Sequence, residues 1–162
     1  MARFGKDEAA DVLALHQLVA DWCYRLDIHD CVGVEALCTA DVEYLVGGVA
    51  HRGRDAVAAF YAARNERVRK HQRDGVRTQR HSVSNFRVAF TGKERASIAF
   101  LLVNYSAEGP APALNLIGPT IIADSRFECA REDDGEWRIA LFDSTPVFIG
   151  NDPFLNAAVV PK

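Results

Sequence analysis

The segment Thr78–Ser106 reads TQRHSVSNFRVAF-TGK-ERASIAFLLVNYS and carries the clearest structural signal in the chain. Much of it alternates between hydrophobic and polar residues, which is typical of β-strands because successive side chains point to opposite faces. The Gly92-Lys93 pair between the two halves indicates a tight turn. The segment therefore predicts a hairpin of two long strands, Thr78–Phe90 and Glu94–Ser106.

Two further strands follow this hairpin. They are expected at Asn115–Arg131 and Glu136–Ile149, with turns at Glu108-Gly109-Pro110 and Asp133-Asp134-Gly135. Regular hairpin turns join strands that pair antiparallel, so the sequence predicts an antiparallel meander. The last residues, Asn156–Lys162, are expected to form a tail that packs locally.

Upstream of the meander the hydrophobic period is 3.6 residues and indicates helices. Three helices are expected, at Asp7–His29, Val32–Cys38 and Ala56 to about Lys70. Between the last two helices, a Gly47-Gly48 turn predicts a short hairpin of Val42–Val46 with Val49–Arg52.

The elements together predict one α+β domain over residues 1–162. Three N-terminal helices are expected to pack on a strongly curved antiparallel sheet, so that the domain is a cone. A cavity between the helices and the concave face of such a sheet suits one small, mostly apolar ligand held by a few polar groups.

The composition narrows the choice of partners. The net charge is −3, so nucleic acid and anionic membranes are not expected partners. The chain start lacks the apolar core of a secretory signal, and no uncharged run is long enough to span a bilayer, so a cytoplasmic location is expected. The four cysteines show neither CxxC nor zinc spacing, so we expect buried free thiols and no metal site.

A basic tract runs from Arg64 to Arg80 and holds seven Arg or Lys residues. Such a run is compatible with a nucleic-acid patch. Aromatic residues do not alternate with the charges, however, so a solvated helix end followed by a loop is the preferred interpretation.

Asp27 and His81 are the first candidates for catalytic residues. Asp27 falls at the end of the first helix, beside its buried stripe, and the alternative is a polar residue making a local cap or salt bridge. His81 falls early in the first long strand, on the face of Val83 and Asn85, and a lone strand histidine is often structural. As a pair they are stronger candidates than either residue alone, because a carboxylate can fix the tautomer of an imidazole that transfers a proton.

Other polar side chains are candidates for binding a ligand. Possible hydrogen-bond donors to a ligand oxygen are Tyr24, Tyr44, Asn104 and Ser106. In the strand before the last, Asp124, Arg126 and Glu128 alternate with apolar neighbours. The alternation favours a solvent-facing charged side, and the other possibility is that Asp124 and Arg126 line the cavity.

The order of elements resembles the NTF2-like superfamily, in particular its SnoaL-like and scytalone dehydratase branch, over about Leu13 to Phe154. Four motifs carry the resemblance. They are Leu26-Asp27-Ile28-His29-Asp30, Asp41-Val42-Glu43-Tyr44, Arg77-Thr78-Gln79-Arg80-His81 and Asp134-Gly135-Glu136-Trp137-Arg138-Ile139.

The resemblance implies a catalytic Asp27–His81 dyad in which the histidine removes a proton during an elimination. It also implies that Tyr44 helps to polarise a substrate carbonyl, and it turns Arg126 toward the cavity. The family's other substrate-holding residues are replaced here, with Leu26 in place of a tyrosine, so scytalone itself is not the expected substrate.

These observations lead to a first hypothesis and two alternatives. The first is a cofactor-independent lyase, a dehydratase or dehydrohalogenase, that acts on a small cyclic hydrophobic substrate. The second is an isomerase of the ketosteroid type or a polyketide cyclase with the same dyad. The third is a non-catalytic module that binds a ligand or assembles like a dioxygenase small subunit.

An oligomer is also expected. Ser97 is the only polar residue in the strand segment Ala96–Val103. Because a strand that is apolar on both faces must be covered on both, we expect a homodimer or homotrimer formed through the sheet.

Overall fold

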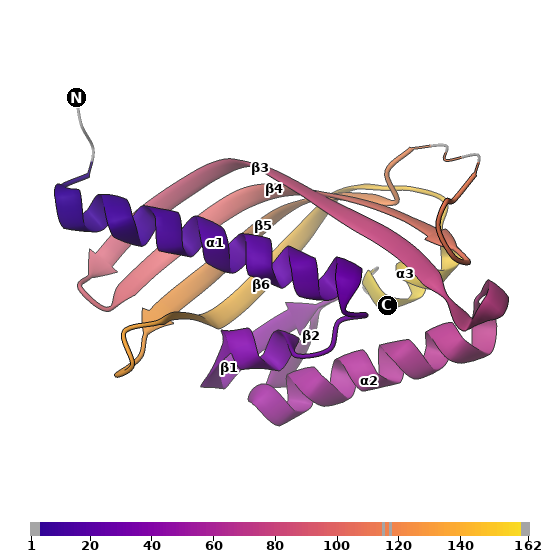
Figure 1. Ribbon diagram of the computed structural model, residues 1–162, viewed down its shortest axis with the longest axis horizontal. Helices are drawn as coiled ribbons and strands as arrows, with labels where there is room; N and C mark the ends of the chain where they lie inside the picture. Colours follow the sequence, from indigo (N-terminus) through magenta and orange to yellow (C-terminus); the bar gives the residue numbers. More distant parts are fainter. Residues whose placement is uncertain (1–3, 115, 117, 160–162) are drawn as a thin grey trace.

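The computed structural model describes residues 4–114, 116 and 118–159, which form helices packed against one sheet (Figure 1). The helices and 3₁₀ turns are α1 (Lys6–Ile28), η1 (Val34–Leu37), α2 (Arg54–His71), η2 (Arg73–Gly75) and α3 (Pro153–Val159). The strands are β1 (Cys38–Val46), β2 (Val49–Arg52), β3 (Arg77–Gly92), β4 (Arg95–Glu108), β5 (Ile121–Arg131) and β6 (Trp137–Ile149). The α+β class expected from the sequence is confirmed.

The sheet has the strand order β2-β1-β6-β5-β4-β3. The predicted meander is present, because β3, β4 and β5 each pair antiparallel with the strand that follows in the sequence. β1 pairs parallel with β6, however, so the sheet is mixed and the expectation of a wholly antiparallel sheet was wrong. The β1–β6 pairing joins strands far apart in the sequence, and turn motifs report only pairings between sequence neighbours.

Two long helices and two short 3₁₀ turns precede the meander, so the expectation of three helices was wrong in part. The second predicted helix is reduced to η1. Asp30, Cys31 and Gly33 all adopt positive φ, which takes the backbone out of the α-helical region just before η1. The chain therefore turns sharply after α1 and has little room for a further helix before β1.

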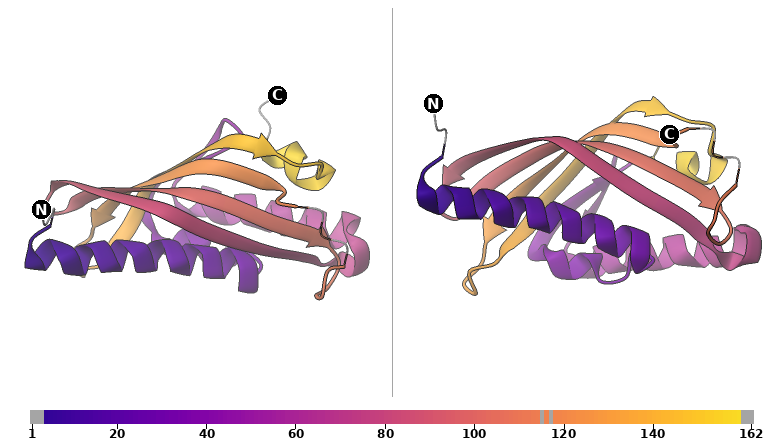
Figure 2. Two further views of the ribbon diagram at one scale, coloured as in Figure 1. Left: turned by 90° about the horizontal axis from the view of Figure 1, so that it is seen from above. Right: turned by 45° about the horizontal axis from the view of Figure 1, so that its top comes forward.

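The sheet is twisted and is not strongly curled, which corrects the expected strong curvature. Figure 2 shows it from two further sides, with β2 and β3 as separate edges. The register shifts between neighbouring strands lie at a few positions, so the bending is local and does not close the sheet.

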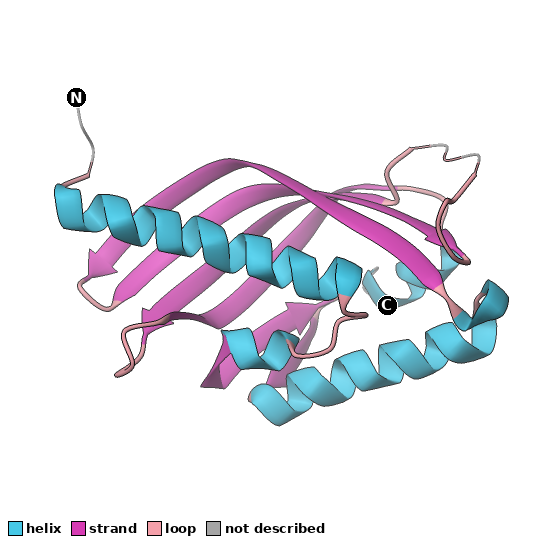
Figure 3. Cartoon of the chain, viewed as in Figure 1, coloured by secondary structure: helices cyan, strands magenta, loops and turns pink. Residues whose placement is uncertain are grey.

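α1 packs against β3 and β6, and α2 packs against β1, β2 and η1 (Figure 3). Trp22 of α1 lies at the centre of the aromatic core. Its ring centroid is 5.4 Å from that of Phe127 and 5.2 Å from that of Phe142. The predicted amphipathic stripe of the first helix is therefore the face that packs on the sheet.

A bulge in β3 changes which side chains face the helices. The register with β4 shifts between Ser84 and Arg87, and Asn85 has φ 57°. Asn85 is exposed, while Phe86 turns inward and stacks on His16 with centroids 4.3 Å apart. The expectation that Asn85 shares the face of His81 was wrong, because one extra residue reverses the alternation.

The C-terminal part of the chain differs from the prediction. The strand expected from Asn115 begins at Ile121, and residues 115 and 117 lie outside the described residues. The expected tail is instead helix α3, which begins at Pro153, and residues 160–162 lie outside the described part. Within the described residues, no helix combines the length and hydrophobicity needed to cross a membrane.

Candidate active site

Asp27 and His81 meet where the end of α1 lies beside the start of β3. The Nδ1 atom of His81 lies 2.6 Å from Oδ1 of Asp27, and the backbone N–H of His81 donates to Oδ2 at 2.7 Å. The side chain of His81 is only 10% exposed and that of Asp27 only 7% exposed. Both oxygens of one carboxylate are thus held by a single residue.

The local sequence explains why this meeting occurs. The last carbonyl groups of a helix have no partner within the helix and need donors from elsewhere. The side chain of Gln79 donates to the carbonyl of Leu26 at 2.7 Å, and Arg80 donates to the carbonyl of Asp27 at 3.2 Å. The start of β3 therefore completes the hydrogen bonds of the α1 end and brings His81 beside Asp27.

Asn104 of β4 fixes the other side of the imidazole. Its Nδ2 lies 2.9 Å from Nε2 of His81, and its Oδ1 accepts a hydrogen bond from the Thr120 hydroxyl at 2.6 Å. An amide nitrogen only donates, so with the Asn104 amide in this orientation Nε2 accepts and the ring proton sits on Nδ1, facing Asp27. In this arrangement His81 is neutral and its lone pair is on Nε2.

A cavity of about 140 Å³ adjoins the imidazole. His81 and Asn104 contribute to its wall, whereas Asp27 lies behind His81 and is not part of the lining. Much of the remaining wall is apolar and includes Trp22, Leu102 and Phe142. The site is thus a mostly apolar chamber with a hydrogen-bonded histidine on one side, which is the usual form of a small-molecule site.

A chain of three hydrogen-bonded side chains reaches the cavity through Tyr61. The indole N–H of Trp22 donates to the Tyr44 hydroxyl at 2.9 Å, and that hydroxyl lies 2.6 Å from the Tyr61 hydroxyl. Burial raises the pKa of both tyrosines well above the ordinary value. Both hydroxyls therefore keep their protons at neutral pH and can donate hydrogen bonds.

The structure separates the other candidates. Tyr44 is fully buried and stands behind Tyr61, so it does not line the cavity itself. Tyr24 is 56% exposed on the outer side of α1 and also lies outside the cavity lining. Ser106 is held by Arg77 and Thr120 beyond the cavity wall. Asn104 is thus the one of these four that lines the cavity.

The charged side chains of β5 point away from the cavity. Arg126 is half exposed and forms ion pairs with Glu128 and Asp143 on the outer face of the sheet, and Asp124 is exposed on the same face. The cavity-facing orientation that the resemblance implied for Arg126 is therefore wrong, and the solvent-facing orientation favoured by the alternation is correct. The charged side chains of Asp124 and Arg126 keep their hydration on the outer face, whereas the inner face is packed with aromatic rings and would leave them without water.

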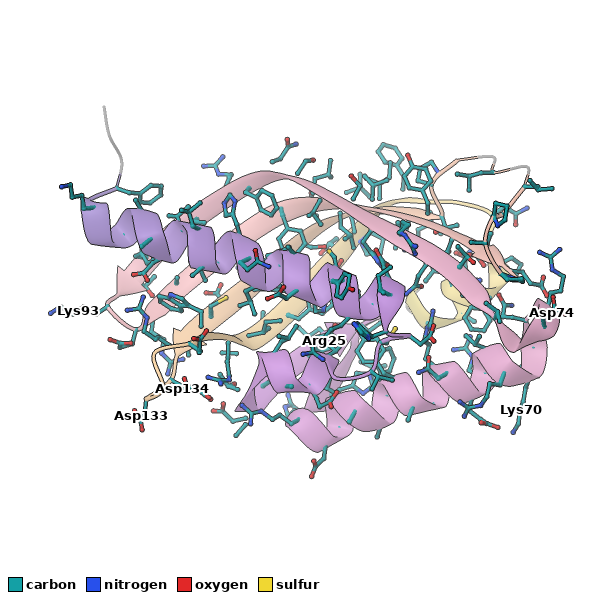
Figure 4. All side chains as sticks on the ribbon, in the orientation of Figure 1. Arg25, Lys70, Asp74, Lys93, Asp133 and Asp134 are labelled. Carbon is teal, nitrogen blue, oxygen red and sulfur yellow. The ribbon has the colours of Figure 1, made fainter. Side chains whose placement is uncertain are left out.

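The basic tract is not uniformly solvated, which corrects the interpretation made from the sequence. Arg64, Arg67 and Arg77 line the cavity, while Arg69, Lys70, Arg73 and Arg80 are exposed. Figure 4 shows Lys70 pointing outward from α2. The sequence does contain a sign that these arginines face inward. Arg64 and Arg67 follow Tyr61 and Phe60 at steps of three, four and seven residues, which places them on the same helix face.

The four cysteines are buried and unpaired, as expected from the sequence. Cys31 contributes to the cavity wall, and burial raises the pKa of its thiol to about 11. A thiol with so high a pKa remains protonated at neutral pH and is a weak nucleophile. Cys31 is therefore not a candidate nucleophile in this cavity.

The family follows from a sequence comparison. The model of the SnoaL-like domain matches residues 7–143, so the chain belongs to the SnoaL-like domain family, part of the NTF2-like superfamily. The match spans α1 to most of β6, which includes Asp27, His81 and Asn104. A comparison with curated protein sequences gave no match.

Solved structures share the fold at low sequence identity. A protein from Novosphingobium aromaticivorans named "Putative Scytalone Dehydratase" has a TM-score of 0.71 and 16% identity, covering 95% of this chain and 94% of that one. ActVI-ORFA from Streptomyces coelicolor has a TM-score of 0.73 and 13% identity, covering 88% and 98%. A Catenulispora acidiphila protein in complex with S-DNPA has a TM-score of 0.69 and 16% identity, covering 85% and 94%.

Proposed function

We propose that this protein is a cofactor-independent lyase that acts on a small, cyclic, largely apolar substrate. In this proposal His81, oriented by Asp27, removes a proton from the carbon next to a carbonyl group, and water or halide leaves from the following carbon. The observation that supports it most is the His81 imidazole, which is hydrogen-bonded to a buried carboxylate through Nδ1 and forms part of the wall of a mostly apolar cavity.

The reaction balances with the groups at hand. Nε2 takes the proton, the C–H electron pair becomes the new C=C bond, and the leaving group departs with the electrons of its own bond. A departing hydroxide then receives the proton from Nε2 and leaves as water. Asp27 stabilises the imidazolium that forms between these two steps, since its Oδ1 is 2.6 Å from Nδ1.

Tyr61 takes the role that the resemblance gave to Tyr44. Tyr61 is part of the cavity wall, and its hydroxyl is hydrogen-bonded to Tyr44, which in turn accepts a hydrogen bond from Trp22. The Tyr44 hydroxyl can donate a hydrogen bond to the Tyr61 hydroxyl. Tyr61 is then free to donate its own hydrogen bond to a developing enolate oxygen. When a substrate displaces the Asn104 amide from Nε2, that amide becomes a second donor for the substrate.

The relatives are consistent with this class of reaction. One structure of the same fold carries a dehydratase name, and another was solved with a small molecule, S-DNPA. An isomerase or cyclase would share the proton abstraction and differ only in where the proton goes next. The non-catalytic alternative predicted a cavity filled by aromatic side chains, and the open cavity beside His81 favours the enzyme.

Elimination from a simple cyclic hydroxyketone tests the proposal. We expect the protein to convert 3-hydroxycyclohexanone to cyclohex-2-enone, measured by the ultraviolet absorbance of the enone. His81→Ala should lower the rate by about 10²- to 10⁴-fold, the usual contribution of a positioned base. His71→Ala is the matched control, because His71 is exposed at the end of α2.

Deuterium exchange separates abstraction from elimination. Exchange of the α-protons of cyclohexanone in D₂O, followed by NMR, reports proton removal even where nothing can leave. Exchange without elimination would favour the isomerase or cyclase. Equal exchange by wild type and His81→Ala would contradict a catalytic role for His81.

A further inference from the structure

Three arginines line the cavity without any acidic partner in its wall. Arg64 and Arg67 come from α2 and Arg77 from the first residue of β3. Among the described residues that form the lining there is no aspartate or glutamate. The chamber that holds His81 is therefore positively charged at its α2 side.

Arg77 is neutralised from outside the cavity. It forms an ion pair with Asp152, and the two side chains are only 4% and 12% exposed. Gln72 and Ser106 accept further hydrogen bonds from the same guanidinium. Arg77 therefore attaches the start of α3 to the sheet and contributes little net charge to a ligand.

Arg64 and Arg67 contact only neutral acceptors. Arg64 donates to Oδ1 of Asn65 and to Oε1 of Gln79, both at 2.9 Å, and Arg67 donates to the carbonyl of Phe154 at 3.0 Å. Within the described part of the chain neither has a carboxylate within 4.0 Å, and both are half-buried. Partly buried cations without counter-charges attract an anion, and guanidinium binds a carboxylate with two parallel hydrogen bonds.

β3 places the residue that Arg64 contacts close to His81. Gln79, which contacts Arg64, precedes His81 by two residues on the same face, and this corresponds to roughly 7 Å along a strand. The cavity volume of about 140 Å³ is close to that of a chamber that holds one benzene-sized ring, roughly 150 Å³. One six-membered ring with a group at either end spans this distance and fits this volume.

We propose that the cavity selects single-ring ketones that carry a carboxylate on the side of the ring opposite the reacting carbon. Arg64 and Arg67 bind the carboxylate, and the ring lies along the wall between them and His81. This assignment of substrate class rests on the proposed function, since it places the reacting carbon at Nε2 of His81. The anion preference itself depends only on the two arginines.

Binding measurements on a matched pair of ligands test the charge preference. The probes are 4-oxocyclohexanecarboxylate and the neutral 4-oxocyclohexanecarboxamide, which have the same ring and nearly the same shape. Isothermal titration should show the carboxylate binding at least tenfold more tightly than the amide, with a preference that weakens as salt is added. Equal affinities for the two probes would overturn the proposal.

Variants of α2 locate the preference. Arg64→Gln combined with Arg67→Gln should reduce the tenfold preference to about one. Arg69→Gln is the control, because Arg69 is exposed on the same helix and paired with Glu66. Circular dichroism checks that each variant is folded, and the wild-type comparison stands whether or not the double variant folds. An unchanged preference in a folded double variant would overturn the proposal.

His81→Ala distinguishes this inference from the proposed function. The variant should keep the preference for the carboxylate and lose α-proton exchange of the bound ketone. A lost charge preference with His81-dependent exchange would overturn only the substrate class. Exchange that does not depend on His81, together with an intact preference, would overturn only the catalytic mechanism.

Discussion

A single carboxylate, that of Asp27, holds His81 by both its ring and its backbone, at 2.6 Å to Nδ1 and 2.7 Å to the amide nitrogen. The ring cannot rotate about χ1 without breaking the first contact, and β3 cannot slide along α1 without breaking the second. The orientation of Nε2 toward Asn104 follows from this pair of bonds.

Replacing Asp27 by asparagine should reduce catalysis more than stability. Asparagine is nearly the same size and keeps one oxygen for the His81 backbone amide, but it carries no charge to stabilise the imidazolium. We expect the elimination rate to fall by about 10²- to 10⁴-fold, as in other histidines that lose their orienting carboxylate. Asp30→Asn, an exposed change near the same helix end, is the control. A rate within twofold of wild type would contradict the dyad.

Two substitutions of Asn104 should impair the base to very different extents. Asn104→Asp puts an acceptor at Nε2, so the ring would carry a proton on both nitrogens between two carboxylates and would no longer act as a base. Asn104→Ala removes the contact and leaves the lone pair free. We expect the Asp variant to lose at least 10²-fold in rate and the Ala variant about tenfold or less. The same loss in both variants would show that Asn104 acts only through packing.

The Asp27–His81 pair could be proposed from the sequence because its two members are fixed by local signals. The end of the first helix and the start of the first long strand are both visible in the hydrophobic pattern. The register that brings them together is set by Gln79 and Arg80, which donate to the α1 carbonyls. These donors lie directly before His81, so the chain carries the information locally.

Other features depend on long-range packing and could not be predicted this way. Tyr61 and Tyr44 come together only when α2 lies against β1, and the β1–β6 pairing brings Phe142 beside Tyr44. The bulge at Asn85 reverses an alternation that looks regular in the sequence. In the basic tract, helical spacing places Arg64 and Arg67 on the face of Phe60 and Tyr61, but only the packing of α2 against the sheet decides that this face lines the cavity.

The Tyr44–Tyr61 pair sets an alkaline limit on stability. Burial raises the pKa of both hydroxyls, whereas in the unfolded chain they ionise near 10. Above that pH the unfolded state releases tyrosine protons that the folded state retains. The contribution of the two tyrosines to stability is therefore fully present below about pH 10 and is lost as the pH rises further. Each buried tyrosine should cost about 1.4 kcal/mol of unfolding free energy per further pH unit.

Urea unfolding of Tyr61→Phe measures this contribution. Between about pH 9 and about pH 11 the variant should lose less stability than wild type, because it has one buried phenol fewer. The buried thiols titrate in the same range in both proteins and cancel in the comparison. Parallel losses in the two proteins would show that Tyr61 ionises as easily when folded as when unfolded.

The outer face of the sheet carries an apolar patch, Val103, Ile122 and Phe148, with the first two directly opposite each other on β4 and β5. Phe148 is 66% exposed. Exposed apolar residues that gather on one face usually mark a contact with another protein chain. The expectation of a homodimer or homotrimer through the sheet therefore remains a prediction, and this patch is its proposed contact.

Val103→Glu should convert such an oligomer to a monomer. A symmetric contact buries the new carboxylate once in every copy, and an unpaired buried charge costs several kcal/mol per copy. Light scattering during size-exclusion chromatography gives the mass directly. Leu114→Glu is the control, because Leu114 is 79% exposed but lies outside the sheet. A wild-type protein that is already monomeric at micromolar concentration would reject the contact, and an oligomer that survives Val103→Glu would place it on another surface.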